Sequence, residues 1–367
     1  MRLETIEKRH EFESRRKPKT WAHPMPSSRQ LVIEGFGNYV GSTSTDYIIR
    51  KDGSRKEVPL SNIRELVIPT GNTISTKALA WASIYNSKVL ITSQAGRPLG
   101  VLVPIGYDNK AHIRIEQYRA YDNDRGATIA KVLIESKLQA YGSLLRKHGS
   151  KLNLDEYLGR VRRLPKFDDN DKLRRELLAI EGFTSNLYKI QLVRLLPKTL
   201  RYEFHESYKS LYPMNNVFNL AYEVLNWQLW SACLNAGLDP FVGFMHTIRH
   251  GRPSLICDLI EPYRALIDDF LLSVTADLKP SDTIVRMDNG KPRIFLNQKT
   301  STALIGQIRS LLNWAVEKPR RRGYGYKARI KTVIDDDIFA LADFILNERS
   351  DWKPTNIVEL KKYYLDP

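Results

Sequence analysis

The chain has 367 residues, enough for two domains of ordinary size, and its 42% hydrophobic and 27% charged residues are typical of a globular protein. Lys and Arg number 57 against 41 Asp and Glu, and the net charge of +16 favours polyanionic partners such as nucleic acid; a merely solubilising surface is the alternative. Only two cysteines occur, which excludes a disulfide framework and a four-thiolate zinc site.

The first 28 residues alternate acids and bases without an apolar signal core, so we expect a charged N-terminal extension. A run of about 18 apolar residues, the length that spans a membrane, does not occur. Even the apolar segment 217–238 contains Asn219, Glu223 and Asn226. The sequence therefore predicts a cytoplasmic protein without a membrane span.

Residues 29–110 contain brief apolar runs separated by turn residues, the pattern of short β-strands. Asp52-Gly53 predicts a hairpin, because this pair suits the positive φ angles of a type I′ turn. Ser75 is placed to cap one short helix, and residues 89–92 return to strand. We expect a β-strand domain across this range.

From about residue 125 the apolar residues recur at helical spacing. The pattern predicts a helix ended by Gly149, and three further helices over residues 171–196, 217–236 and from 254–258 to 268. Strands followed by helices predict an α+β fold. In it an N-terminal β-strand domain precedes an all-helical catalytic domain, residues 111–367, with a basic C-terminal tail. The two domains should join near residues 107–121.

Glu181 is the first candidate for chemistry, because it lies on the apolar face of the second long helix beside Gly182. The glycine removes a side chain and leaves room for another group to approach. The alternative is a structural glutamate that is satisfied by an arginine or by Tyr188.

His246 is the second candidate, since it follows the apolar run 241–245 just after a helix stop at Gly237. A lone histidine in such a setting is also common as a hydrogen-bonded core residue, and that alternative stays open.

Asp258 and Glu261 are the third candidates, because a spacing of three puts both carboxylates on one face of a helical turn. The alternative is a capping box with Asp258 as N-cap and Glu261 at position N3, which Pro262 in an early-turn position would support.

Taken together, a histidine nitrogen and carboxylate oxygens from three elements form a plausible divalent-metal site with open positions for a phosphate. Magnesium or manganese would neutralise the charge that develops on the phosphate and activate a hydroxyl nucleophile. Six basic residues near these positions fit a polyanionic substrate: Arg174, Arg175, Lys189, Arg249, Arg252 and Arg264.

Three segments, LLAIEGFTSNLY, GLDPFVGFMH and GRPSLICDLIEPYR, in that order, resemble the CRISPR adaptation integrase, the CRISPR-associated protein one family. In the N-terminal half, EVPLSNIRELVIPTGNTISTKALAWA followed by VLITSQAGRPLGVL resembles the β-domain of that family. The resemblance covers about residues 31–268. Thr184 and Ser185 stand where the family often has paired alanines, and Tyr212 stands in the place of an acid.

The resemblance implies that Glu181, His246 and Glu261 bind Mg²⁺ or Mn²⁺, with Asp258 as a further acid against the site. It also implies a homodimer formed through the β-domain and a small ferredoxin-like partner, the CRISPR-associated protein two. The implied substrates are double-stranded and branched DNA.

The C-terminal segment KPRRRGYGYKARIK, residues 318–331, interleaves basic residues with tyrosines, which suits phosphate contacts and base stacking. A solvated basic loop is the alternative. The candidate DNA-binding residues are Arg252, Arg264, Arg320, Arg321, Arg322 and Lys327.

Three functions are compatible with these residues: an integrase that inserts short foreign DNA into a CRISPR repeat array, a general metal-dependent nuclease acting on branched DNA, and a non-catalytic DNA-binding scaffold. Acids at buried positions argue against the scaffold, which has no need of them. Integrase and nuclease differ only in whether a DNA hydroxyl or water attacks, and the resemblance favours the integrase.

Overall fold

The computed structural model describes residues 30–94, 98–104, 110–165, 169–201, 212–275, 278–288, 291–318 and 326–363. The chain divides into two compact units, residues 1–109 and 110–367, and each has its own buried hydrophobic residues. The boundary falls inside the predicted junction, 107–121. The predicted charged extension, 1–28, lies outside the described residues.

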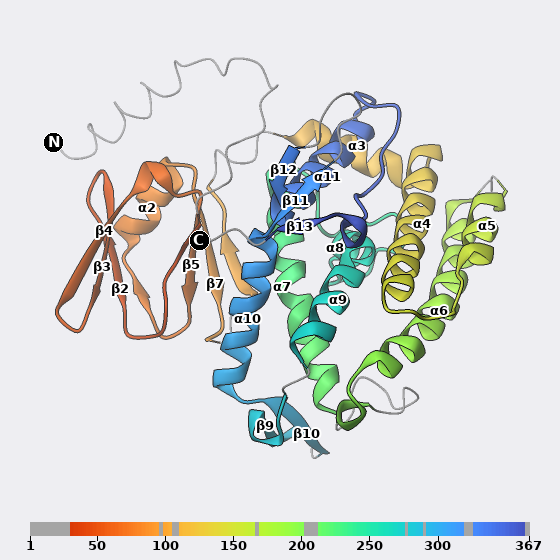
Figure 1. Cartoon of the computed structure of the whole chain (residues 1–367). Coiled ribbons are helices and arrows are strands. Elements are labelled where there is room, and N and C mark those ends of the chain that lie inside the picture. Colours follow the sequence, from red (N-terminus) through yellow and green to blue (C-terminus); the bar gives the residue numbers. More distant parts are fainter. Residues whose placement is uncertain are drawn as a thin grey trace. The chain divides into compact units, whose positions relative to one another are not determined.

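The first unit consists of two four-stranded sheets and one helix, α2 (Thr76–Ile84) (Figure 1). One sheet has the order β1-β5-β7-β8, with strands Gln30–Val32, Glu65–Pro69, Lys88–Thr92 and Pro98–Leu102; β7 and β8 are antiparallel and the other neighbours parallel. The other has the order β4-β3-β2-β6, with strands Ser54–Pro59, Asp46–Lys51, Tyr39–Ser42 and Thr73–Ile74. Side chains from both sheets and from α2 form one core, including Val40, Leu66 and Trp81.

Local features of this unit follow the sequence predictions. Asp52 and Gly53 both have positive φ angles, 46° and 78°, and join β3 to β4 as the predicted hairpin. The Ser75 hydroxyl accepts a hydrogen bond from the Ala78 N–H and caps α2. The strand predicted at 89–92 lies in β7.

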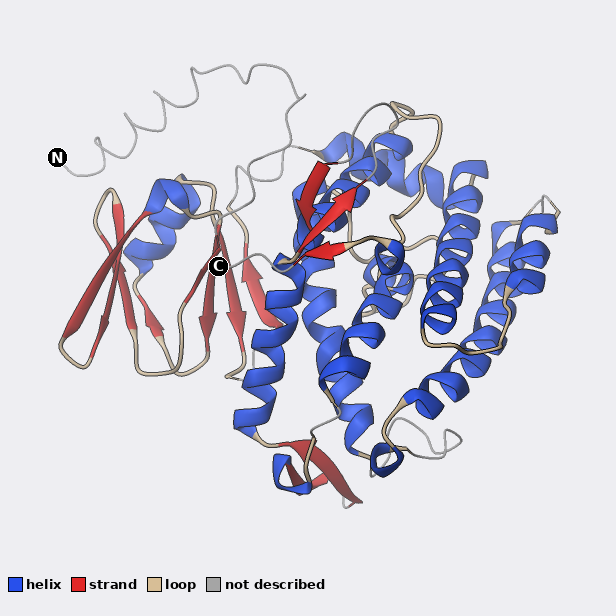
Figure 2. Ribbon diagram, viewed as in Figure 1, coloured by secondary structure: helices blue, strands red, loops and turns tan. Residues whose placement is uncertain are grey.

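The second unit is mainly helical (Figure 2). Its helices are α3 (Ala111–Tyr121), α4 (Asp124–Lys147), α5 (Asp155–Arg163), α6 (Asn170–Leu195), α7 (Pro213–Ala236), α8 (Ser254–Leu259), α9 (Arg264–Val274), α10 (Gln298–Asn313) and α11 (Ile330–Ile345). Helix α4 is buried over most of its length and packs against α5, α6, α9 and the 3-10 turn η4 (Glu261–Tyr263). In Figure 1 it stands between α6 and α9.

The α+β class is confirmed, but the second unit is not entirely helical. A hairpin of β9 (Thr283–Asp288) and β10 (Lys291–Leu296) lies at one end of the unit in Figure 2. At the other end, a three-stranded sheet has the order β12-β11-β13, with strands Tyr326–Arg329, Ala315–Lys318 and Lys362–Tyr363. All five strands follow residue 280, where no element was predicted.

The ends of three predicted helices are confirmed. Gly149 and Gly237 have φ angles of 72° and 83° just after α4 and α7, and Pro197 follows α6. The fourth predicted helix is wrong as a continuous element, because residues 254–274 form α8, η4 and α9 in succession. Pro262 lies in η4, where it cannot donate a helical hydrogen bond. Within the described ranges, no helix is long and apolar enough to span a membrane.

Candidate active site

Asp258 holds the loop that carries His246. Its fully buried carboxylate accepts hydrogen bonds from the backbone N–H groups of Phe244, Met245 and His246 at 2.5, 2.9 and 2.9 Å. The same carboxylate lies 2.7 Å from Nδ1 of the His246 ring. Because an ionised carboxylate only accepts, Nδ1 carries the proton and Nε2 of a neutral ring keeps its lone pair. Asp258 lies near the end of α8, so the capping-box interpretation is wrong.

Gly243 allows this close approach of the loop to α8. A Cβ at Gly243 would lie 2.6 Å from Oδ2 of Asp258 and 2.8 Å from the carbonyl oxygen of Ser254. Real Cβ atoms essentially never show such distances, so any side chain here must push the loop away from the carboxylate.

We expect Gly243→Ala to lower the free energy of unfolding by about 1–3 kcal/mol, because it forces atoms into an already packed site. The measurement is urea denaturation followed by circular dichroism. Gly306→Ala is the matched control, since Gly306 lies in α10 and a Cβ there meets nothing within 4 Å. Equal stability of the two variants would contradict the steric argument.

Lys137 joins the two glutamates of the site. It comes from α4, is 2% exposed, and its ammonium binds Oε1 of Glu181 on α6 and lies 2.5 Å from Oε2 of Glu261 in η4. Ser185 donates a second hydrogen bond to Oε1 of Glu181 at 2.8 Å. Glu181 is thus satisfied by a lysine and a serine, and not by the arginine or Tyr188 that the structural alternative named.

Glu261 is ionised although it is buried. Burial raises the pKa of its carboxyl, but the nearby cations Lys137 and Arg264, together with His246, outweigh that effect and lower the pKa to about 2. Nε of Arg264 donates to Oε1 of Glu261 at 3.0 Å. The pKa of Lys137 is raised, because its carboxylate neighbours outweigh the effect of burial. Glu261, Lys137 and Arg264 therefore all stay charged at neutral pH.

Asp268 is a further buried carboxylate that is connected to this cluster. Asp268 on α9 accepts hydrogen bonds from the hydroxyls of Tyr188, at 2.7 Å, and Tyr222. Burial raises the pKa of Asp268 to about 6, although the two tyrosine hydroxyls act in the opposite direction. The Arg264 guanidinium lies over the Tyr222 ring, 4.5 Å from its centroid, so Asp268 is linked to Glu261 through Tyr222 and Arg264.

Stacked aromatic rings connect these residues to α4. The rings of Tyr141 and Tyr188 are parallel, with centroids 3.5 Å apart. The ammonium of Lys137 lies 5.3 Å from the centroid of Tyr141, within reach of a cation–π contact. Four helices and η4 therefore share one continuous network that fixes where Glu181 and Glu261 point.

Lys137 was not predicted as a site residue, although its place in the sequence carries a signal. Lys137 lies four residues after Leu133 and three before Ala140, on the apolar stripe used to predict the helix. A lysine on a buried stripe requires an acid partner from another element. Arg174 was expected to face a polyanion, but it is buried and donates from Nε to the carbonyl of Phe244 at 3.1 Å.

The predicted metal ligands share this region without forming a tight cluster. Among the residues the structure describes, no group of three His, Cys, Asp or Glu side chains is close enough to hold a metal ion. The physical reason is that the Lys137 ammonium lies between Glu181 and Glu261, and Asp258 is occupied by the loop and the His246 ring.

The candidate DNA-binding residues differ in exposure, and three of them lie outside the described part of the chain. Arg252 is half-buried in the loop before α8, and Lys327 is exposed on β12. Arg264 is bound to Glu261 and Tyr222, as described above. Arg320, Arg321 and Arg322 lie outside the described residues.

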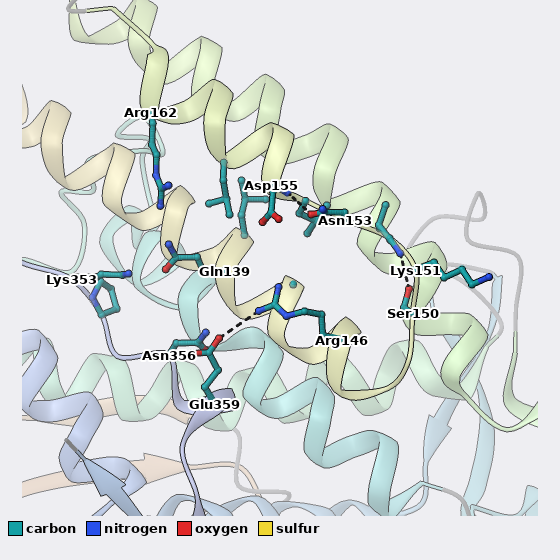
Figure 3. Close-up of a pocket in the computed structure, with 16 residues that line it drawn as sticks. Gln139, Arg146, Ser150, Lys151, Asn153, Asp155, Arg162, Lys353, Asn356 and Glu359 are labelled. Carbon is teal, nitrogen blue, oxygen red and sulfur yellow. Dashed lines mark hydrogen bonds and ion pairs between the residues drawn. The ribbon is translucent and has the colours of Figure 1, made fainter. Parts of the chain in front are cut away.

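A polar cavity of about 710 Å³ lies elsewhere in the second unit, between α4, α5 and the segment 353–359 (Figure 3). Arg146 and Glu359 form an ion pair across it at 3.6 Å. None of the predicted catalytic or DNA-binding residues lines this cavity. The cavity is therefore separate from the region of Glu181, His246 and Glu261.

The comparison with known protein families decides the relationship. The family model described as CRISPR associated protein Cas1 matches residues 31–309, which is most of the chain and includes Glu181, His246, Asp258 and Glu261. The chain belongs to the Cas1 family. A "CRISPR-associated endonuclease Cas1" from Korarchaeum cryptofilum is 29% identical over 270 residues, covering 68% of this chain and 79% of that relative.

Solved structures agree on the Cas1 fold. A casposase bound to integration product has a TM-score of 0.70 at 21% identity, covering 89% of this chain and 92% of that one. A chain of a Cas6-RT-Cas1–Cas2 complex has a TM-score of 0.69 at 18% identity, covering 94% of this chain and 37% of that one. At these identities the likeness shows the fold alone.

Proposed function

We propose that this protein is a metal-dependent DNA integrase and endonuclease that inserts short DNA fragments into a CRISPR repeat array. The observation that carries the proposal is the charged cluster of buried Lys137, buried Glu261 and half-buried Glu181 beside His246, whose ring is oriented by Asp258. Burial of such charges lowers stability, and a DNA-binding scaffold has no need of them. A relative is named an endonuclease, and a casposase with the same fold is bound to an integration product.

The donor types of Glu181, His246 and Glu261 suit a divalent metal ion, and the three side chains would have to move closer together to hold one. Oε2 of Glu261 is a buried oxygen that the Lys137 ammonium binds at 2.5 Å. A buried carboxylate oxygen that binds an ammonium is a place that a metal ion could bind in exchange for it. Carboxylate and imidazole donors suit Mg²⁺ or Mn²⁺, which would stabilise charge on a phosphate.

The chain's own residues would prepare the site for that ion. Asp258 holds the proton on Nδ1 of His246, so that Nε2 is directed to bind rather than to donate. Arg264 holds Oε1 of Glu261, so Oε2, which the Lys137 ammonium binds, is the oxygen that would turn to the ion. Thus Arg264, predicted as a DNA contact, is proposed mainly to orient Glu261.

We further propose the assembly that the family resemblance implies. Residues 29–110 would form the dimerisation domain and residues 111–367 the catalytic domain of a cytoplasmic homodimer, which binds double-stranded and branched DNA. A small ferredoxin-like Cas2 partner would bridge two dimers; a chain of similar fold belongs to a complex with Cas2. The basic residues Arg252, Arg320, Arg321, Arg322 and Lys327 would contact phosphates.

A branched DNA that mimics a half-integrated fragment tests the reaction. Strand transfer exchanges one phosphodiester for another, so an enzyme built for it also runs in reverse. With Mn²⁺, we expect the protein to release the flap with a 3′ hydroxyl and to join the remaining pieces into a strand longer than either input. The products are read on a denaturing gel, with His246→Ala as the inactive control.

Water as the nucleophile can only shorten DNA. Flap release without a longer strand, in Mg²⁺ and in Mn²⁺, would therefore refute the integrase and leave the general nuclease as the function.

A further inference from the structure

Lys137 has a position that neither packing nor solubility explains. Its ammonium is carried by α4 into the interior, where it meets one carboxylate from α6 and one from η4. Burial of a lysine has a large desolvation cost, so its ammonium needs charged partners in the folded protein. Both partners here are proposed metal ligands.

The Lys137 ammonium and a divalent metal ion would compete for the same two carboxylates. Two carboxylates so close to one another need a cation between them to stay ionised together. In the protein as described, that cation is the Lys137 ammonium. A divalent ion on the same carboxylates would bring two further positive charges close to the ammonium, and like charges at such short range repel strongly inside a protein.

We propose that Lys137 is a tethered counter-ion, which holds Glu181 and Glu261 together in the metal-free protein and releases carboxylate oxygens when a divalent ion binds. This inference rests on the proposed metal site. Lys137 is therefore a positioning residue, which acts through the two glutamates and does not touch DNA.

The structure also provides a place for the displaced ammonium. The Tyr141 ring lies one helical turn from Lys137 on α4, with its centroid 5.3 Å from the ammonium. The flexible four-carbon stem lets the ammonium shift toward the face of that ring without movement of α4. A rigid guanidinium would not move so easily, which explains why a lysine suits this position.

Removal of the charge at residue 137 should strengthen metal binding. In full-length Lys137→Met, which keeps most of the side-chain volume, we expect Mn²⁺ to bind about ten-fold more tightly or better, because a repelling charge is gone. Free Mn²⁺ is measured directly by electron paramagnetic resonance, without reference to activity. We also expect a lower Tm in EDTA than for the unsubstituted protein, and a larger rise in Tm on addition of Mn²⁺.

Lys147→Met is the matched control, because Lys147 lies on the same helix and pairs with Asp269 rather than with the site. It should bind Mn²⁺ as the unsubstituted protein does. Lys137→Gln is the second test variant, which is neutral but still donates hydrogen bonds, and it should also bind Mn²⁺ more tightly.

The outcomes separate this inference from the proposed function. If the unsubstituted protein binds no Mn²⁺, the proposed metal site is wrong. If it binds Mn²⁺ and both neutral variants bind equally or more weakly, the tethered counter-ion is wrong. Should the variants unfold in EDTA, refolding by Mn²⁺ supports the exchange of ammonium for metal, and failure to refold overturns it.

Discussion

His246→Ala is expected to lower the rate of Mn²⁺-dependent DNA cutting and joining by about 10³-fold or more, because it removes a donor of the proposed metal site. The effect on the fold should be small, since the ring is at the edge of the site and the loop is held by its backbone bonds to Asp258. Cleavage of branched DNA and a thermal melt provide the two measurements.

Glu181→Gln and Glu261→Gln should cause losses of the same order, because each amide keeps the shape but not the charge of a carboxylate. Asp269→Asn is the control, as Asp269 is a well-buried acid that pairs with Lys147 and His148 instead. A glutamate or histidine variant with near-normal activity would not be a ligand. Loss of activity in Asp269→Asn would show that any buried charge change is harmful.

Asp258→Ala is expected to be the most destabilising single change at the site, by about 3–5 kcal/mol. It leaves three backbone N–H groups without their acceptor and frees the His246 ring. Urea denaturation gives the free energy of unfolding, and the DNA assay should show activity falling with it.

Asp258→Asn separates the two roles of this carboxylate. It keeps one oxygen acceptor but replaces the other with a donor, so we expect a smaller loss of stability and still a large loss of activity. If Asp258→Ala unfolds at the same urea concentration as the unsubstituted protein, the loop is not held by Asp258 and our account of the site is incorrect.

Features determined by neighbouring residues could be predicted from the sequence. The Asp52-Gly53 hairpin, the Ser75 cap and the helix stops at Gly149 and Gly237 each depend on the conformational preference of one or two residues. The α+β class could be predicted because the strand pattern precedes the helical pattern along the chain. Short strands after residue 280 were missed, because two to six residues carry little periodic signal.

The predicted residues Glu181, His246, Asp258 and Glu261 lie in one region, but their contacts with one another were not predicted. Asp258 and Glu261 are three apart in sequence, and spacing alone suggested a shared helical face. The break at Pro262 instead directs Asp258 to the His246 loop and Glu261 to Lys137. Which cation pairs with which acid depends on how α4, α6 and η4 pack, and local sequence does not encode that.

The Lys137 contacts also impose an order in time on the making of the protein. Glu181 is synthesised 44 residues after Lys137, so α4 and α6 can pair early. Glu261 follows Lys137 by roughly 120 residues, which at roughly 5–20 residues per second is a delay of about 6–25 seconds on the ribosome. Throughout that interval the lysine has only one of its two acids. We therefore expect Lys137 to stay in contact with water until η4 emerges, at a time when α9, α10 and α11 have not yet been made.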